Sequence, residues 1–217
     1  MTKTTRKNLM VKAFQTELAN REKHNIFNKE YIRTERKMIG AVNNRGENLS
    51  CEQVRDYCNR WLSVIGEGGS KIVYGMDDIV IALHKQNIFY NNQIKKQVEI
   101  WSKIALTPEA VYFNPVLSYG LHRGDKLSGN DSRYINNSFV VSQKAKVFAT
   151  IEECIRQMYI LNKSLFNSTD VEYYRKAMES AIHKAGAGDI KAENIGLIYD
   201  YSEGEYRAVF IDYGYGW

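Results

Sequence analysis

The spacing of hydrophobic residues divides the chain into helical and extended stretches. Residues 5–40 carry apolar side chains at helical spacing, which predicts a helix. A second helix is expected after the polar connector NNRGENLS, because Ser50 followed by Gln53 resembles a capping box. One side of that helix is expected to carry Val54, Tyr57, Trp61 and Leu62. We interpret residues 1–62 as an N-terminal helical segment that offers no chemistry.

From Leu62 onward the pattern changes to short strands. LSVIGEGG, SKIVYG and IVIALHK predict three strands, the last two separated by the turn GMDD. A helix, NNQIKKQVEIWSKIA, is expected next, and two further strands, FNPVLSYGLHR and NNSFVVSQKA, flank the polar loop GDKLSGNDSRYINN. The buried face of this helix is expected to hold Ile94, Val98, Trp101 and Ile104.

Helical spacing returns over residues 150–184. The last thirty residues predict a loop and a hairpin, IGLIYD and AVFID, joined by the polar turn YSEGEY. The apolar positions of the helical stretch are Ile151, Ile155, Met158, Tyr159, Leu161 and Leu165.

Composition excludes several classes of protein. A chain of 217 residues, 44% hydrophobic and 25% charged, is long enough for one buried domain or two small lobes. The net charge of +5 is spread along the chain, so nucleic-acid binding is not expected. Cys51, Cys58 and Cys154 form no metal or disulfide pattern. With neither a signal sequence nor eighteen consecutive apolar residues, we expect a protein of the reducing cytoplasm without a membrane partner.

Two short motifs near the C-terminus carry polar residues at close spacing. GDIKAEN contains Asp189, Lys191 and Asn194, and FIDYGYG places Asp212 directly after a predicted strand. Either motif alone is compatible with residues that cap a hairpin or begin a turn. In this chain they follow a glycine-rich turn, IGEGGSKIVYG, and a helix with a central Glu. That order of parts resembles the order in protein kinases.

The resemblance covers roughly residues 63 to 217 and is greatest to small bacterial and phage kinase-like sequences. It implies an α+β, protein-kinase-like fold after the N-terminal helical segment: a β-rich N-lobe at residues 63–145 and a reduced helical C-lobe at residues 146–217. It also implies ATP and Mg²⁺ as cofactors.

The same resemblance implies roles in phosphoryl transfer. Negative charge gathers on the γ-phosphate, so the site needs a metal ion and a group that orients the attacking hydroxyl. Asp189 is expected to orient or deprotonate that hydroxyl, and Lys191 to contact the γ-phosphate. Asn194 and Asp212 are expected to hold Mg²⁺, with Asp212 as the principal ligand.

The glycine-rich turn matches the kinase pattern only in part. Gly66, Gly68 and Gly69 fit its first part, but Lys71 stands where the third glycine is expected. An ordinary glycine-rich hairpin would carry the same residues.

Two further places are expected to contact the adenine. Val73 matches the apolar residue that covers the ring. The run FVVSQKA resembles the strand that leads to the kinase hinge, so backbone groups from Gln143 to Ala145 are expected to meet the edge of the ring.

The third strand departs most from the family. Kinases carry there a lysine that pairs with the α- and β-phosphates and with a Glu on the next helix, for which Glu99 is well placed. Ala82 occupies the lysine's position. Side chains alternate along a strand, so His84 shares the face of Ala82 and Lys85 points to the other face unless a bulge turns it. The lysine is therefore absent, displaced to Lys85, or replaced by Lys71.

Two departures concern regulation and substrate. Ala187 and Gly188 stand where His-Arg usually precedes the catalytic Asp, so control by activation-loop phosphorylation is not expected. The sequence stops at Trp217, before an activation segment. Residues 1–62 or a partner protein would then supply the missing surface.

Three functions fit these residues. The first is an atypical Ser/Thr kinase-like enzyme that phosphorylates a protein, itself included, and that would suit a viral factor acting on host proteins. The second is a pseudokinase that recognises or inhibits a partner protein with little or no catalysis. The third, a small-molecule kinase of the aminoglycoside-phosphotransferase type, is disfavoured by Lys191 and by the early end of the chain.

Overall fold

Two compact units make up the part of the chain that the computed structural model describes. We name them the five-stranded unit (residues 51–98 and 116–144) and the hairpin unit (residues 99–115 and 145–214) and treat each by itself. The helix predicted over residues 5–40 and the catalytic candidate Asp189 lie outside the described residues. The described residues are 51–76, 78–85, 93–121, 123–126, 134–136, 138–188 and 191–214.

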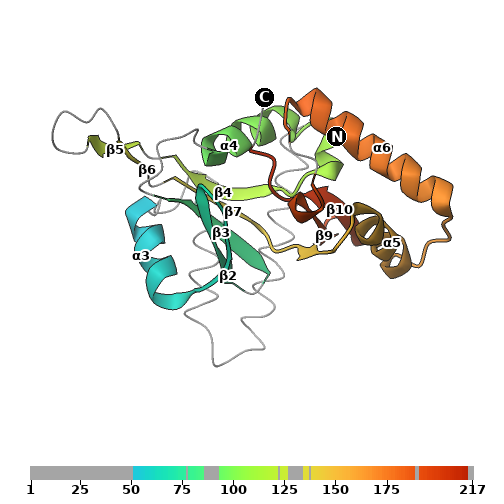
Figure 1. Ribbon diagram of the computed structural model, residues 1–217, viewed down its shortest axis with the longest axis horizontal. Helices are drawn as coiled ribbons and strands as arrows, with labels where there is room; N and C mark the ends of the chain where they lie inside the picture. Colours follow the sequence, from blue (N-terminus) through green and yellow to red (C-terminus); the bar gives the residue numbers. More distant parts are fainter. Residues whose placement is uncertain are drawn as a thin grey trace. The chain divides into compact units, whose positions relative to one another are not determined.

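The five-stranded unit is built on one antiparallel sheet with the strand order β1-β2-β3-β7-β4 (Figure 1). All five of the strands predicted for this part of the chain are present. Their bounds are β1 Ser63–Glu67, β2 Lys71–Met76, β3 Ile79–His84, β4 Val116–Gly120 and β7 Phe139–Gln143.

The polar loop predicted between β4 and β7 is in part a second, two-stranded ladder. β5 (Arg123–Lys126) pairs with β6 (Tyr134–Asn136) in antiparallel register. The prediction of a loop was wrong here because a backbone ladder satisfies its own N–H and C=O groups, whatever the polarity of its side chains. Alternation of apolar and polar residues predicts only those strands that have one buried face, so it does not predict a ladder of polar residues.

Helix α3 (Cys51–Trp61) lies against the sheet (Figure 1). The Tyr74 hydroxyl on β2 donates a hydrogen bond to Oδ1 of Asn59, at 2.7 Å. Among the described side chains of this helix, those of Cys51, Val54 and Cys58 are buried. Of the predicted face only Val54 is buried, and Trp61 is 72% exposed because the helix ends there and the chain enters the edge strand β1.

Helix α4 (Gln93–Ile104) has the buried face that its spacing predicts. Ile94, Val98, Trp101 and Ile104 are each at most 5% exposed. The residues of this helix are divided between the two units after Val98.

The hairpin unit surrounds the predicted C-terminal hairpin. β9 (Ile195–Asp200) pairs with β10 (Glu205–Phe210), and the short strand β8 (Lys146–Val147) extends this sheet beside β9. Two 3₁₀ turns, η3 (Pro108–Tyr112) and η4 (Ala192–Asn194), complete the unit together with the helices α5 and α6. Its core includes the ring of Phe113, which contacts the rings of Phe210 and Tyr213, and all three residues are at most 2% exposed.

The helical stretch predicted over residues 150–184 is two helices, α5 (Ile151–Leu161) and α6 (Ser168–Ala185). Asn162 ends the first, because its side chain bonds both the N–H and the C=O of Tyr206 on β10. Asn167 begins the second with a capping box. Leu165 lies in the break and is fully exposed, which corrects its assignment to an apolar helix face.

Cys51, Cys58 and Cys154 are present as thiols, and all three are buried. Burial raises the pKa of the Cys58 and Cys154 thiols to about 12. These two thiols are therefore neutral at physiological pH and unsuited to nucleophilic chemistry.

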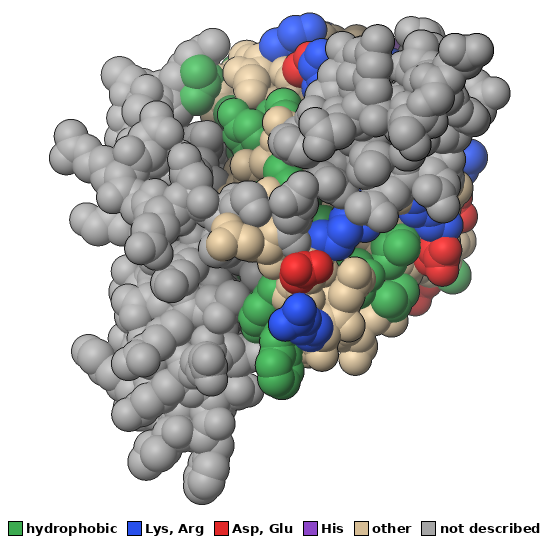
Figure 2. Space-filling view, turned by 90° about the vertical axis from the view of Figure 1, so that its left-hand side faces the viewer, with side chains coloured by type: hydrophobic (Ala, Val, Ile, Leu, Met, Phe, Trp, Pro, Cys, Tyr) green, Lys and Arg blue, Asp and Glu red, His purple; other side chains and the backbone are tan. Residues whose placement is uncertain are grey.

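The molecular surface mixes apolar and charged groups. On the face in Figure 2, the described hydrophobic side chains lie among Lys, Arg, Asp and Glu side chains. Within the described part of the chain, no helix is both long and apolar enough to cross a bilayer.

We expect Gly120→Ala to lower the free energy of unfolding by about 1–3 kcal/mol, since overpacking a filled core costs that much. A Cβ atom at this position would lie 2.8 Å from Sγ of Cys51 and would overlap the ring of Phe139. Urea unfolding measures the loss. Gly69→Ala is the matched control, because a Cβ there meets no atom within 4 Å. Equal losses in the two variants would contradict the packing argument.

Candidate nucleotide and metal site

The predicted glycine-rich turn is the connection between β1 and β2. The N–H of Gly68 donates to the carbonyl of Lys71 at 2.9 Å and closes the turn. Gly66 lies opposite Val73 in the ladder, next to an irregularity in register. Gly68 and Gly69 are exposed at the tip of this hairpin, where the absence of side chains lets the N–H of Gly69 approach an anion, whereas the N–H of Gly68 is used within the turn.

One face of the sheet carries the residues expected beside the nucleotide. Val73 on β2 pairs with Ala82 on β3, and Lys71 pairs with His84. Cross-strand partners share a face, and so do residues two apart on a strand, so these four side chains lie on the same face. Lys71 is only 7% exposed, and His84 is 1% exposed. The lysine on the face of Ala82 is therefore Lys71.

Lys85 lies just after β3 and interacts with the glycine-rich hairpin. Its N–H donates to the carbonyl of Ser70 at 2.8 Å. Its Nζ is 2.5 Å from a carboxylate oxygen of Glu67, which is itself 59% exposed. A phosphate that approaches Lys85 would have to compete with this carboxylate.

The helix that follows β3 contacts the base of the hairpin through polar groups. The Ser70 hydroxyl donates to Oε1 of Gln93 at 2.5 Å. Gln93 and Gln97 are both buried on α4. Glu99, the expected partner of the phosphate-binding lysine, is exposed on the part of α4 that belongs to the hairpin unit.

The segment expected to meet adenine begins at the end of β7. Gln143 is the last residue of this strand, and its side chain is buried. The N–H of Lys144 donates to the carbonyl of Asp78 at 2.7 Å, so this donor is already used. Ala145 is half-buried and packs close to Gly196, where an added Cβ would lie 2.7 Å from that of Ala145.

The β9–β10 hairpin brings the two predicted metal ligands to one of its ends. Ile195 pairs with Phe210, and one step further the N–H of Ile211 donates to the carbonyl of Asn194 at 2.8 Å. Asn194 is the last residue before β9, and Asp212 is the second residue after β10. Both are half-buried.

The residue after Asp212 anchors this end of the hairpin. Tyr213 is fully buried, and its hydroxyl donates to the carbonyl of Asn114 at 2.9 Å. Its ring meets the ring of Phe113 edge-on, with the centroids 5.0 Å apart. Because Tyr213 is fixed on both its polar and its apolar side, the backbone at Asp212 has little freedom.

The donor groups at this end fit Mg²⁺. Mg²⁺ prefers oxygen ligands and is usually held by one or two carboxylates together with substrate phosphates and water. Asn194 and Asp212 supply an amide oxygen and a carboxylate. Among the described residues no group of three or more His, Cys, Asp or Glu could hold a metal, but a site completed by phosphate oxygens does not require one. Lys191, which precedes η4, is exposed.

The chain matches no protein-family model and no curated protein. Solved structures of WbdD show a distant likeness. A 2.2 Å crystal structure of WbdD is 13% identical with a TM-score of 0.35, covering 67% of this chain and 30% of that one. A second structure, of WbdD described as a bifunctional kinase-methyltransferase, is 14% identical with a TM-score of 0.34. The match covers 67% of this chain and 29% of the WbdD chain. A complex of WbdD with the kinase inhibitor LY294002 is 14% identical to this chain, with a TM-score of 0.36. The match covers 68% of this chain and 31% of the WbdD chain.

This chain thus spans about 30% of the length of those WbdD chains. At such TM-scores the likeness decides neither fold family nor activity, and the function has to be argued from the residues themselves.

Proposed function

We propose that this protein is a compact kinase-like phosphotransferase that uses ATP and Mg²⁺ to phosphorylate a hydroxyl group of a protein, its own chain included. The observation that carries this proposal is the 2.8 Å bond from the N–H of Ile211 to the carbonyl of Asn194. This main-chain bond joins Asn194 to the residue before Asp212 at one end of the hairpin, which supports a metal site shared by these two residues.

The order of the elements also supports the proposal. A glycine-bearing hairpin, β1–β2, is followed by β3, then by α4 and then by the strands that complete the sheet. The hairpin unit follows with two helices, the segment that contains GDIKAEN, and the β9–β10 hairpin that ends at Asp212. This order of elements is the one in which protein kinases carry their motifs, and it supports the proposal.

In this proposal different residues of the chain bind the phosphates, the adenine and the metal ion. Exposed N–H groups of the glycine-rich turn bind phosphate oxygens, and Val73 covers the adenine, whose edge meets backbone groups of Gln143 and Ala145. Asn194 and Asp212 hold Mg²⁺, which neutralises the phosphate charge when bound.

The residues that precede η4 in the sequence act on the acceptor side of the reaction. Lys191 contacts the γ-phosphate, and Asp189 orients the acceptor hydroxyl and takes its proton. The leaving group is ADP, so the bond broken is the one between the γ-phosphorus and the β–γ bridging oxygen.

The test is incorporation of phosphate from ATP labelled on the γ-phosphate, followed by intact mass. We expect the purified chain to gain 80 Da per phosphate, a mass fixed by chemistry, in the presence of Mg²⁺ and to gain none with EDTA. Asp189→Ala should lose incorporation yet still bind ATP, because this side chain acts on the acceptor rather than on the nucleotide. Equal incorporation by Asp189→Ala would remove that residue from the mechanism.

A second function, a nucleotide-binding module with little turnover, is favoured by one observation. Ala82 replaces the usual lysine, and the alternative at Lys85 is already paired with Glu67. Mg²⁺-dependent ATP binding without phosphate transfer by the wild-type chain would establish this second function and exclude the first for the chain alone.

A further inference from the structure

A cavity of about 280 Å³ lies within the hairpin unit, lined by residues of η3, α5, α6 and β10 and of the loop after α5. None of its lining residues belongs to the predicted nucleotide or metal site. Four of them are tyrosines, which come from four different elements of the fold: Tyr112, Tyr159, Tyr174 and Tyr206.

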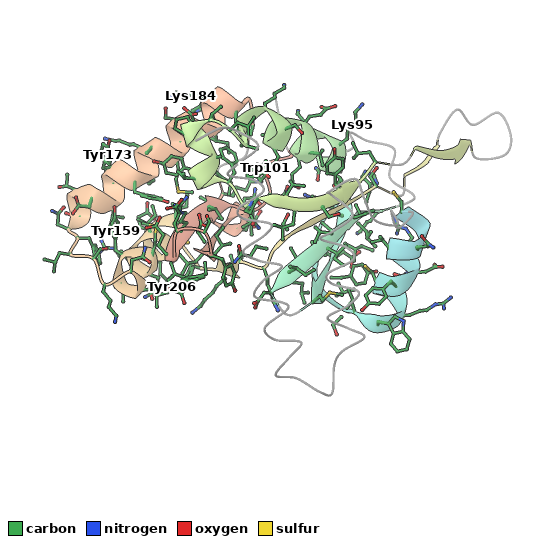
Figure 3. All side chains as sticks on the ribbon, turned by 180° about the vertical axis from the view of Figure 1, so that it is seen from behind. Lys95, Trp101, Tyr159, Tyr173, Lys184 and Tyr206 are labelled. Carbon is green, nitrogen blue, oxygen red and sulfur yellow. The ribbon has the colours of Figure 1, made fainter. Side chains whose placement is uncertain are left out.

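The aromatic rings are held in place by their neighbours. Tyr112 and Tyr174 meet edge-on with centroids 5.4 Å apart, and Tyr159 meets Tyr174 at 6.4 Å. The other flank of Tyr159 stacks on Phe166 at 5.2 Å. The Tyr174 hydroxyl donates to the carbonyl of Ala208 on β10. In Figure 3, Tyr159 and Tyr206 lie on the side of α6 that faces α5, and Tyr173 lies on its outer side.

Three of the tyrosines, Tyr112, Tyr159 and Tyr174, remain uncharged over the physiological pH range. Burial raises the pKa of Tyr112, Tyr159 and Tyr174 above the ordinary value for a phenol. A neutral phenol ring keeps the negative face that attracts a cation.

The charged side chains that line the cavity are Glu205 and Arg207, and Asp200, which does not itself line the cavity, forms an ion pair with Arg207. Arg207 lines the cavity and is only 12% exposed at its side chain. Its Nη1 is 3.2 Å from Oδ2 of Asp200, and its Nη2 is 2.8 Å from Oε1 of Glu205. Two carboxylates thus surround one guanidinium, which leaves this group with a net charge of −1. Glu205 itself lines the cavity and is half exposed.

We propose that this cavity binds an organic cation, an alkylammonium or guanidinium group. Ring faces and a net negative charge attract such a cation, and removal from water strengthens that attraction. The same net charge disfavours an anion. A neutral aromatic ligand would gain nothing from Glu205. The group could belong to a free small molecule or to a Lys or Arg side chain of a protein, and the experiment separates these two sources.

The first test compares two ligands of the same shape and different charge. Choline and its neutral carbon analogue, 3,3-dimethyl-1-butanol, are titrated into the full chain without ATP. Binding is measured from the changes in NMR chemical shifts. We expect saturable binding of choline and at least about five-fold weaker binding of the neutral analogue. Equal affinity for the two would overturn the cation proposal.

Two further ligands identify the source of the cation: lysine amide and arginine amide, each acetylated on its α-amino group so that the side chain keeps its charge. They are titrated in the same way. Tighter binding of either amide than of choline assigns the cavity to a protein side chain, and the reverse order assigns it to a free methylated ammonium. The absence of saturable binding by all of these cations would also overturn the proposal.

Variants locate the site. Tyr206→Leu is expected to weaken binding of the preferred cation by roughly five- to thirty-fold, the range for a cation over a ring face that is partly removed from water. Glu205→Gln should weaken it as well, because it removes the excess charge. Tyr173→Leu is the matched control, since Tyr173 is 75% exposed and does not line the cavity. Unchanged affinity in folded Tyr206→Leu and Glu205→Gln proteins would place the cation elsewhere.

The cavity and the proposed kinase activity can fail independently. Cation binding is measured without ATP and requires no phosphate transfer. The same titration of Asp189→Ala should give the wild-type affinity, and a loss there would mean that the cation binds at the nucleotide site instead.

Discussion

Asp212→Ala is expected to abolish Mg²⁺-dependent ATP binding while the fold remains intact. Asp212 is the carboxylate of the predicted metal pair and follows β10, where Tyr213 fixes the backbone. Asp212 and Asn194 would hold Mg²⁺, which would neutralise the phosphate charge of ATP. Removal of the Asp212 carboxylate would leave only the amide oxygen of Asn194 from this pair. Loss of a residue that merely orients a ligand costs roughly 10–100-fold in metal affinity, and loss of the ligand itself should cost at least that much.

Calorimetry of ATP binding with Mg²⁺ and with EDTA measures this effect. Glu203→Ala is the matched control, because it removes a carboxylate from the turn at the opposite end of the same hairpin. The control should bind ATP as the wild type does. An Asp212→Ala protein whose ATP affinity still rises on addition of Mg²⁺ would show that the metal is held by other residues.

The elements with strong periodicity could be predicted from the sequence. The buried face of α4 follows directly from residues three and four apart, and the strands of the main sheet follow from short apolar runs. The α+β class is therefore confirmed. The end of α5 was missed because it depends on Asn162, whose amide bonds the backbone of Tyr206, 44 residues away in the sequence. A tertiary contact of this kind leaves no local signature.

Part of the candidate sites could be predicted from the sequence and part could not. That Asn194 and Asp212 flank the same hairpin was predictable, because a motif marks each of them. The aromatic cavity was not, since its tyrosines are separated by up to 94 positions, from Tyr112 to Tyr206, and only folding brings them together. The high tyrosine content, 15 residues, was the only available signal and did not indicate a place.

The burial of Lys71 bears most directly on catalysis. Lys71 shares a face with Ala82, the position of the usual phosphate-binding lysine, and is two residues along β2 from the partner of Ala82. That offset corresponds to about 6.6 Å along a strand, a distance that an extended lysine side chain spans. Lys85 lies beyond the end of β3, and its Nζ is 2.5 Å from a carboxylate oxygen of Glu67, so a phosphate at Lys85 would compete with that carboxylate.

We therefore expect Lys71→Met to lower the rate of phosphate transfer by roughly 10²–10³-fold, as the loss of one preorganised charge in a transition state does. Lys85→Met should change the rate by less than about five-fold, the size expected for a partly exposed ion pair. Methionine keeps the length and apolar stem of lysine, so the two variants differ from the wild type in charge and not in packing.

Single-turnover kinetics with γ-labelled ATP measures both variants, and unfolding curves confirm that each is folded. A rate that falls with Lys85→Met and not with Lys71→Met would assign the phosphate to Lys85 and would mean that ATP displaces Glu67. If neither substitution changes the rate, transfer proceeds without a lysine in this sheet. The phosphate charge would then be balanced by Mg²⁺ and Lys191, which would make the hairpin unit the principal source of catalytic charge.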